Sequence, residues 1–567
     1  MIGFKFSNNL TLNWNLIHNL LQLFMRNFLV IILIFFSIKS FSQNISKEIS
    51  SDVKLVVGIV VDQMKYEYIP KFWNKYGEKG FKRLINNGFI SKNSHFSYAV
   101  TSTGPGHATV VTGTSPNYHG IIGNDWYDPK INKSIYCVDD NNVEPVGTSK
   151  KIGKKSPKNL LVTTISDENR VSTNFRGKTI SVALKDRSAV LSGGHTANFS
   201  FWFDDEDGKF VTSNYYVDEL PKWVEKFNSK KIINSYIQNW DTYYDIDTYT
   251  ESGPDLNPYE VKILGKKNSV FPHSLINLFK KENGVFDYNA IKYSPGGNKI
   301  LVDFALKALE NESLGTDNDT DFLHIGFSSP DYIGHMFGSN SKEVQDTYIR
   351  LDKDIENLLN FLDKKIGENN YLVYLSADHA ITHSPDFLAD NRIPFNKIAS
   401  SKVFAPELNQ FVNNISNYNV FLNHEKINEM NKDAEEIKNK IKTVLLNEPW
   451  VYDVYDFGDL EEVVANNENY SLNMLLNNSH PKYRGDLAFF VNPFWVKRSL
   501  STSNHGTPTT YDTHVPIIFY GKGVKPGSSY ERHNVKDIAP TLAAILGINF
   551  PILTTGNVLG DAIKKLP

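Results

Sequence analysis

Acidic and histidine residues that could bind a metal ion occur in four short segments spread along the chain. In Ser329-Pro-Asp-Tyr-Ile-Gly-His335, an aspartate and a histidine stand four positions apart, close enough to reach one cation together. The other three segments each lie beside a strongly apolar run. Mixed oxygen and nitrogen ligands suit Zn²⁺, and their number suggests a hydrolase with two metal ions. The candidate ligands are Asp62, Asp331, His335, Asp378, His379 and His505.

A threonine near the start of a predicted helix is the candidate nucleophile. In Thr101-Ser-Thr-Gly-Pro-Gly-His107, Pro105 favours the first turn of a helix that starts there. Free N–H groups at a helix N-terminus suit a phosphoryl group, and a metal ion can activate the hydroxyl of Thr103. Taken alone, the segment favours the plainer interpretation that Thr103 caps the helix. The metal-ligand candidates elsewhere in the chain reverse that preference.

Together these segments resemble, in the correct order over residues 55–550, the alkaline phosphatase superfamily, which includes nucleotide pyrophosphatases/phosphodiesterases. Thr103-Gly-Pro-Gly-His107 matches its T-x-P-x-H nucleophile signature. The resemblance implies that Thr103 attacks phosphorus and forms a phosphothreonine that is then hydrolysed. It also implies two Zn²⁺ ions as cofactors, one held by Asp331, His335 and His505, the other by Asp62, Thr103, Asp378 and His379.

Two further segments bear on which ester is cleaved. In enzymes similar to this chain, the asparagine of Gly120-Ile-Ile-Gly-Asn124 donates to a phosphoryl oxygen. Lys185 and Arg187 follow a predicted strand, and two extra cations favour a monoester dianion over a diester. Threonine-nucleophile bacterial alkaline phosphatases have this K-D-R segment. An isolated K-D-R is more simply a solvated basic turn, and a phosphodiesterase on the same scaffold is the alternative function.

Other histidines compete for the position of the late ligand. His383 and His514 lie near the candidate segments, but we prefer His505 because the late ligand of the family is typically followed by glycine, as here by Gly506. His107 is interpreted as a structural histidine of the nucleophile turn.

Two rival classes are disfavoured. Sulfatases mature a cysteine or serine within C/S-x-P-x-R, and Thr103-Gly-Pro-Gly lacks the arginine. A catalytically silent binding protein is disfavoured because all expected ligand and nucleophile positions carry competent side chains. One departure from the family is Ala380, which replaces the glycine of Asp-His-Gly and bears on the backbone there rather than on the ligands.

The composition sets broad limits on partners. The 567 residues include 60 basic and 63 acidic side chains, so the net charge of −3 gives no sign of a nucleic-acid partner. A single cysteine, Cys137, excludes an intrachain disulfide. We expect small-molecule phosphate monoesters as substrates, and nothing in the sequence indicates an oligomeric state.

Residues 1–42 have the pattern of a leader and signal peptide. Met25, a candidate for the true start, and Arg26 precede the apolar run Phe28–Phe36, and the small residues Ser40 and Ser42 follow at plausible cleavage positions. This run is shorter than the roughly 20 residues of a spanning helix. We therefore expect cleavage, no stable membrane insertion afterwards, and a periplasmic or secreted protein. A retained N-terminal anchor is the alternative.

Alternating strand and helix patterns predict a three-layer α/β/α sandwich with a mostly parallel central sheet. The apolar run 54–61 is typical of a central parallel strand, and 70–88 of an amphipathic helix ending at glycine. Further strands are expected at 179–184, 189–192, 322–327, 371–375, 487–491 and 515–520, and further helices at 300–311, 341–362, 432–446 and 538–546.

Two regions break this alternation. Residues 196–298, which contain a hairpin-like Asp207-Gly208, and residues 385–485 are expected as insertions that could cap the site. The chain from 43 to 567 is therefore expected to form a single catalytic domain. Its expected function is that of a secreted zinc-dependent phosphate monoesterase that releases inorganic phosphate.

Overall fold

The computed structural model describes one compact unit of the chain. The described residues are 53–262, 268–281, 283–398, 404–458, 470–497 and 502–564. The expected leader and signal peptide, residues 1–42 with Met25, lies outside them. Within the described ranges, no helix combines the length and the apolar character needed to cross a membrane.

A large sheet forms the centre of the unit. Within the described ranges it has 11 strands, in the order β18-β2-β17-β10-β1-β9-β6-β7-β8-β5, with β19 beside β2. The short outer strands are β5 (Pro145–Val146), β18 (Gly527–Ser529) and β19 (His533–Asn534). The central strand β1 pairs in parallel with β10 and β9. All seven of its residues are buried, because helices cover both faces of the sheet, and this explains its unbroken apolar sequence. The central strands are β1 (Leu55–Val61), β2 (Phe89–His95), β6 (Thr179–Ala183), β7 (Phe199–Asp204), β9 (Asp321–Phe327), β10 (Tyr371–Ser376) and β17 (His514–Gly521).

Antiparallel strands flank the parallel centre. β17 runs antiparallel to both of its neighbours, β10 and β2. At the other edge, β7 and β8 (Lys209–Ser213) form the expected hairpin, with Gly208 of its turn at φ 67°. These two strands lie inside the range 196–298, so the first part of that expected insertion belongs to the sheet itself.

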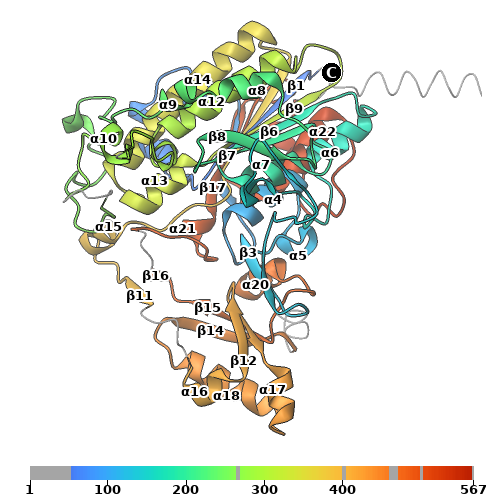
Figure 1. Cartoon of the computed structure of the whole chain (residues 1–567), viewed down its shortest axis with the longest axis vertical. Coiled ribbons are helices and arrows are strands. Elements are labelled where there is room, and N and C mark those ends of the chain that lie inside the picture. The colour runs from blue at the N-terminus through green and yellow to red at the C-terminus, as the bar shows by residue number, and fades with distance from the viewer. Residues whose placement is uncertain are drawn as a thin grey trace, which may run out of the picture. The chain divides into compact units, whose positions relative to one another are not determined.

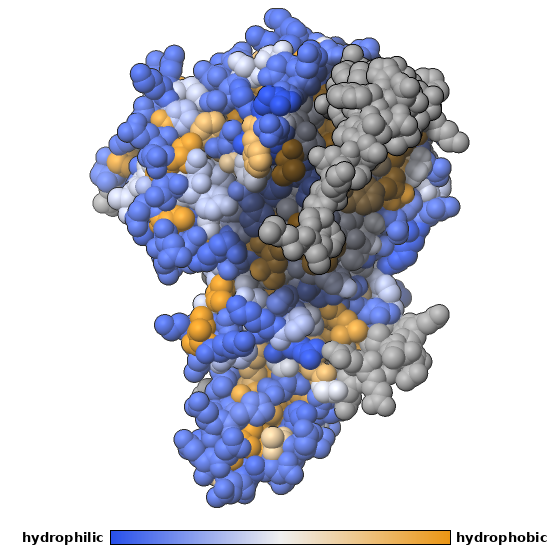
Figure 2. Space-filling view, turned by 90° about the vertical axis from the view of Figure 1, so that its right-hand side faces the viewer, coloured by the Kyte–Doolittle hydropathy of each residue, from blue (hydrophilic) through white to orange (hydrophobic). Residues whose placement is uncertain are grey.

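Helices cover both faces of the sheet, as Figure 1 shows, and this confirms the expected three-layer fold. In α14, the residues Leu351, Ile355, Leu358 and Leu362 are buried at intervals of three and four, so one face of the helix packs inward. One layer contains α3 (Phe81–Asn86), α12 (Gly296–Asn311) and α14 (Lys342–Lys365); the other contains α4 (Thr103–Thr112), α6 (Ile165–Ser172), α7 (Asp186–Gly193) and α22 (Ile538–Leu546). The face of the molecule in Figure 2 is mainly hydrophilic, with hydrophobic residues in small separate areas.

The prediction of one helix over 70–88 is wrong. The segment forms α2 (Tyr68–Lys71), a 3₁₀ turn η1 (Trp73–Lys75) and then α3. Between the last two, the backbone N–H groups of Gly77 and Phe81 donate to the carboxylate of Asp352, each at 2.8 Å. The carboxylate of Asp352 on α14 thus accepts from backbone N–H groups that would bond to backbone carbonyls in a continuous helix.

One strand prediction is wrong, and another is confirmed in a different sheet. Residues 189–192 belong to helix α7, because a short apolar run cannot be told from a helical segment by its periodicity. Residues 487–491 do form a strand, β15 (Leu487–Val491), but it lies outside the large sheet.

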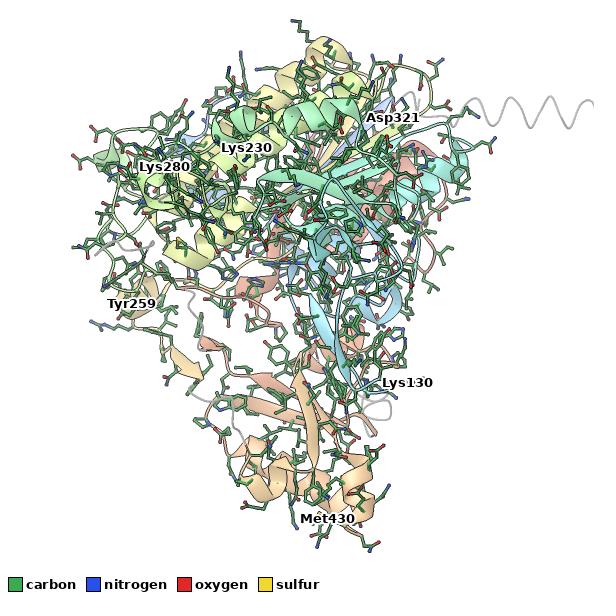
Figure 3. The ribbon with its side chains drawn as sticks, in the orientation of Figure 1. Lys130, Lys230, Tyr259, Lys280, Asp321 and Met430 are labelled. Carbon is green, nitrogen blue, oxygen red and sulfur yellow. The ribbon has the colours of Figure 1, made fainter. Side chains whose placement is uncertain are left out.

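β15 belongs to an antiparallel sheet of four strands, here called the small sheet. Helix α18 (Ala434–Leu446) packs on it through Ile437, Ile441 and Leu445. Figure 3 shows Met430, which follows helix α17 (His424–Glu429) of this region, on the opposite side of the large sheet from Asp321 at the start of β9. The strands of the small sheet are β12 (Val412–Ser416), β13 (Asn419–Leu422), β15 and β14 (Val451–Asp456).

The close approach of Gly80 to α14 gives a testable consequence for stability. A Cβ on Gly80 would lie 2.3 Å from the backbone oxygen of Asp352, so Gly80→Ala must displace the two helices. We expect it to lower the free energy of unfolding by about 1–3 kcal/mol, as overpacking does. Gly560→Ala is the control, because a Cβ there meets no atom within 4 Å. Chemical unfolding followed by circular dichroism measures both; equal midpoints for the two variants would contradict this account.

Candidate active site

The candidate ligands meet at one edge of the large sheet, where parallel strands end. Asp62 directly follows β1, and Asp378 follows β10 by two residues. β9 leads into α13 (Ser329–Phe337), which carries Asp331 and His335. Asp321, labelled in Figure 3, marks the opposite end of β9. In open α/β sheets, ligands bind beyond the carboxyl ends of the strands.

Asp331, His335 and His505 form the first ligand group, with ligand atoms all within 4.8 Å of one another. One helical turn of α13 brings Asp331 and His335 together, so His335 Nε2 lies 3.2 Å from Asp331 Oδ1. His505 Nε2 approaches the same oxygen at 3.6 Å from a loop more than 160 residues away in sequence.

Asp62, Asp331 and His379 form a second group by the same criterion. His379 Nε2 lies 3.5 Å from Asp62 Oδ1 and 3.6 Å from Asp378 Oδ2. The structure thus brings together all six predicted ligand residues, with Asp331 shared between the two groups. The rings of His379 and His505 stack at 3.6 Å, which places the groups side by side.

Backbone carbonyl groups orient the three histidines. Nδ1 of His335 lies 2.9 Å from the carbonyl oxygen of Ser503. Nδ1 of His379 lies 3.0 Å from that of Ala380, and Nδ1 of His505 lies 2.8 Å from that of Thr101. A carbonyl oxygen can only accept, so each Nδ1 carries a proton, and in the neutral ring Nε2 keeps a lone pair. A hydrogen bond from Nδ1 to a backbone carbonyl is typical of histidines that bind metals through Nε2. Ala380 takes part through its backbone, so replacement of the family's glycine leaves the ligand in place.

Several buried polar atoms of this site have no hydrogen bond within the described part of the chain: Asp62 Oδ1, Asp378 Oδ2 and His379 Nε2. The three residues are at most 1% exposed. Buried polar atoms are normally satisfied, and carboxylate oxygen with neutral imidazole nitrogen is a donor set that Zn²⁺ accepts. The residues present therefore fit a bound metal.

Burial sets the protonation of this cluster. It raises the pKa of Asp62 well above its ordinary range, with the Asp378 carboxylate adding to the effect, and it raises the pKa of Asp378 to about 6. It lowers the pKa of His379 to about 3, so this imidazole is neutral at pH 7. Burial would also raise the pKa of Asp331, but the charge of Lys185 lowers it well below its ordinary range.

Thr103 is the first residue of α4 and faces two cations. Its Oγ1 lies 3.4 Å from Lys185 Nζ and 3.3 Å from an Nη of Arg187. The N-cap position is occupied by Ser102, so the interpretation of Thr103 as a cap is wrong. Asn124 Oδ1 accepts from the backbone N–H of Gly104 at 2.7 Å, which fixes the predicted substrate-binding amide beside the nucleophile.

Lys185 and Arg187 are not in a solvated turn. Lys185 occupies the N-cap position of α7 and is 4% exposed. Its Nζ lies 2.7 Å from Asp62 and 2.6 Å from Asp331. Burial alone would lower the pKa of Lys185, but these carboxylates raise it, so the side chain is charged.

The rival histidines lie apart from both ligand groups. His383 Nδ1 is 3.3 Å from Lys65 Nζ, and His514 stacks on His95 at 4.6 Å. His107 is buried and bonds through Nδ1 to Ser192 at 2.9 Å, as expected for a structural residue of the nucleophile turn.

Gln63 is a site residue that the sequence did not reveal. Its side-chain amide donates to Asp331 Oδ1 at 2.6 Å, and its backbone N–H donates to Asp378 Oδ1 at 3.1 Å. It therefore connects two carboxylates from different segments, one in α13 and one after the end of β10. Its φ of 68° is uncommon for a glutamine, and its partners are distant in sequence, so its position after Asp62 was the only available signal.

Comparisons with known proteins agree with this geometry. The profile of the family described as type I phosphodiesterase / nucleotide pyrophosphatase matches residues 56–511. The chain is 41% identical over 521 residues to alkaline phosphatase PhoV of Synechococcus elongatus, covering 90% of this chain and 93% of PhoV. It is also 41% identical over 529 residues to a Myroides odoratus protein named calcium-transporting ATPase, covering 90% and 95%.

A third relative is known in three dimensions. The chain is 38% identical over 524 residues to alkaline phosphatase PafA of Elizabethkingia meningoseptica, covering 90% of this chain and 95% of PafA. The crystal structure of wild-type PafA matches with a TM-score of 0.86 and 37% identity, over 90% of this chain and 99% of that one. The chain therefore belongs to the type I phosphodiesterase / nucleotide pyrophosphatase family, within the alkaline phosphatase superfamily.

Proposed function

We propose that this protein is a zinc-dependent alkaline phosphatase, which hydrolyses small phosphate monoesters through a phosphothreonine and releases inorganic phosphate. The observation that carries the proposal is the approach of two cations, the buried Lys185 and the half-buried Arg187, to the hydroxyl of Thr103. The names of PhoV and PafA, alkaline phosphatases that align with nearly the whole chain, support the same activity.

Two Zn²⁺ ions fit the donor set. One would be held by Asp331, His335 and His505, and the other by Asp62, Asp378, His379 and Thr103. When bound, such ions activate the nucleophile and stabilise the leaving oxygen of an in-line displacement.

The chain's own residues provide the remaining chemistry. Thr103 Oγ1 forms a bond to phosphorus as the bond to the leaving oxygen breaks, and water later releases phosphate from Thr103. The N-terminal N–H groups of α4 face a phosphoryl group attached there. Asn124, held beside Gly104, can donate to an oxygen that is not bonded to the leaving group.

The charges favour monoesters. A monoester dianion carries one more negative charge than a diester, and Lys185 and Arg187 supply two positive charges next to Thr103. Charge-assisted hydrogen bonds to phosphoryl oxygens are the stronger class of hydrogen bond. A phosphodiesterase or nucleotide pyrophosphatase is the second candidate, because the matching family profile carries that description.

The location that we propose is periplasmic or secreted. The sequence of residues 1–42 motivates it, since a charged start, an apolar run and small residues follow one another there.

Thr103→Ala should abolish most turnover of a phenyl phosphate monoester because the attacking oxygen is lost. Bound zinc should persist, since six ligand residues remain. Thr103→Ser should retain a substantial fraction of kcat because it keeps the hydroxyl. Steady-state kinetics and metal analysis of the same samples test this. Near-wild-type activity of Thr103→Ala would place the chemistry elsewhere.

His505→Ala should lose about half of the bound zinc, because one of the two ligand groups becomes incomplete, and activity should fall by far more than tenfold. His514→Ala is the matched control: this histidine stacks on His95 outside both groups. Elemental analysis after gel filtration measures the zinc. The assignment fails if His514→Ala loses metal while His505→Ala keeps it.

Arg187→Ala and Lys185→Ala should reduce kcat/KM for a monoester more than for a matched methyl phenyl diester. Each charged contact to the transferring group is worth roughly ten- to a hundredfold in rate. Lys185 also pairs with Asp62 and Asp331, so the zinc content of the Lys185→Ala variant must be measured in parallel. Arg176→Ala, which removes an exposed arginine paired with Asp319, is the control. Equal losses on both substrates would favour the phosphodiesterase.

A further inference from the structure

The small sheet reaches the active site through the turn between β12 and β13. The register pairs Ser416 with Asn419, so the turn consists of Asn417 and Tyr418, which we call the hairpin tip. Both residues have positive φ, 49° and 63°. Two-residue turns with both φ values positive match the twist of the flanking strands and are well-defined connections. The tip therefore presents its two side chains in a fixed geometry.

Asn417 contacts the segment that carries Asn124. Its Nδ2 donates to the carbonyl oxygen of Asp125 at 2.8 Å. On the other side of Asn124, a Cβ on Gly123 would lie only 2.4 Å from the same Nδ2 atom, so glycine is needed there for Asn417 to approach. The contact continues into the strand β3 (Asp125–Asp128), where Tyr127 packs edge-on against Phe421 of β13 at 4.8 Å.

Tyr418 contacts the segment that carries His505. Its hydroxyl donates to the carbonyl oxygen of Gly506 at 2.6 Å. Phe489 of β15 fixes Tyr418 from the other side: the rings meet edge-on at 5.8 Å, and the backbone N–H of Phe489 donates to the carbonyl oxygen of Tyr418 at 2.9 Å. The small sheet thus fixes the ring and backbone of Tyr418, and the hydroxyl reaches from there to the loop that carries His505.

The loop around His505 has other supports, but they act on its two sides. His505 Nδ1 donates to Thr101, and the N–H and hydroxyl of Thr507 donate to Asp512 at 2.9 and 2.6 Å. Gly506 between them has a φ of 110°, and a Cβ there would have no neighbour closer than 4.0 Å. The backbone N–H of Gly506 faces the Asp512 carboxylate, and the hydroxyl of Tyr418 holds the Gly506 carbonyl oxygen from the side of the small sheet.

We infer that the hairpin tip is a positioning device with two arms: Tyr418 sets the position of the ligand His505, and Asn417 sets that of the substrate-binding Asn124. Adjacent residues of one turn thus place a metal ligand and a substrate contact relative to each other. This inference rests on the proposed function for the roles of His505 and Asn124. It assigns to the small sheet a part in the active site, although that sheet supplies no ligand or nucleophile.

The Tyr418 arm is tested with Tyr418→Phe, which removes the hydroxyl but keeps the ring against Phe489. Loss of one hydrogen bond should speed zinc release to a chelator by roughly three- to tenfold. Amide hydrogen exchange should rise in residues 504–508. Tyr452→Phe is the control, because Tyr452 belongs to β14 of the same sheet and is 62% exposed; both measurements should stay at the wild-type level.

The Asn417 arm is tested with Asn417→Gly, which keeps the positive φ and removes the side-chain donor. We expect KM for a phenyl phosphate monoester to rise roughly three- to tenfold, with zinc release unchanged. Asn431→Gly is the matched control, since Asn431 is an exposed asparagine with a φ of 48° in the same region. This variant should leave KM unchanged.

The outcomes separate the inference from the proposed function. Zinc release and KM at wild-type values in the two tip variants would overturn the inference while a working zinc phosphatase remained. Increased hydrogen exchange throughout the small sheet, instead of at 120–126 and 504–508, would also overturn it, because it would indicate a stability role only. A wild-type protein without zinc or phosphatase activity would overturn the proposed function. Even then, faster hydrogen exchange at residues 504–508 in Tyr418→Phe than in the wild type would show that the tip holds that loop, and equal exchange would show that it does not.

Discussion

The burial of three carboxylates at one edge of the large sheet is the constraint on which the site depends. Asp62, Asp331 and Asp378 are each at most 5% exposed, and ionised carboxylates are stable in such surroundings only when paired with cations. Lys185 supplies one positive charge to Asp62 and Asp331. The remaining negative charge explains why the site suits metal ions.

The surrounding architecture maintains this arrangement of charges. Parallel strands deliver the carboxylates to the same edge, and α13 places Asp331 and His335 one turn apart. Backbone carbonyls fix each histidine ring, and Gln63 connects two of the carboxylates. Since rings and carboxylates are each held by neighbours outside the cluster, the donor atoms are arranged before any ligand arrives. Such preorganisation is what a catalytic metal site requires.

The sequence predicted most of the central fold and all of the ligand cluster, for identifiable physical reasons. Strand β1 was recognisable because burial on both faces leaves an unbroken apolar run, and Asp62, Asp378 and His379 stand just after such runs. The break after Lys75 was missed because it depends on Asp352, a long-range partner. Residues 189–192 were misassigned because a run of three apolar residues, Ala189 to Leu191, fits a helix as well as a strand. Gln63 was missed because its role follows from a backbone conformation and from partners that are distant in the sequence.

The position of His505 so late in the chain has a consequence for biosynthesis. The first ligand group pairs residues 331 and 335 with residue 505 of 567. A growing chain cannot complete that group until residue 505 has been synthesised, after all of the other candidate ligands. Any stabilisation that an ion held by this group would give to the folded state is therefore absent from chains that end before His505, whereas the second group is already complete at His379. Strand β17 also follows His505, so a chain that ends before residue 505 lacks both this ligand group and the strand that joins β10 to β2.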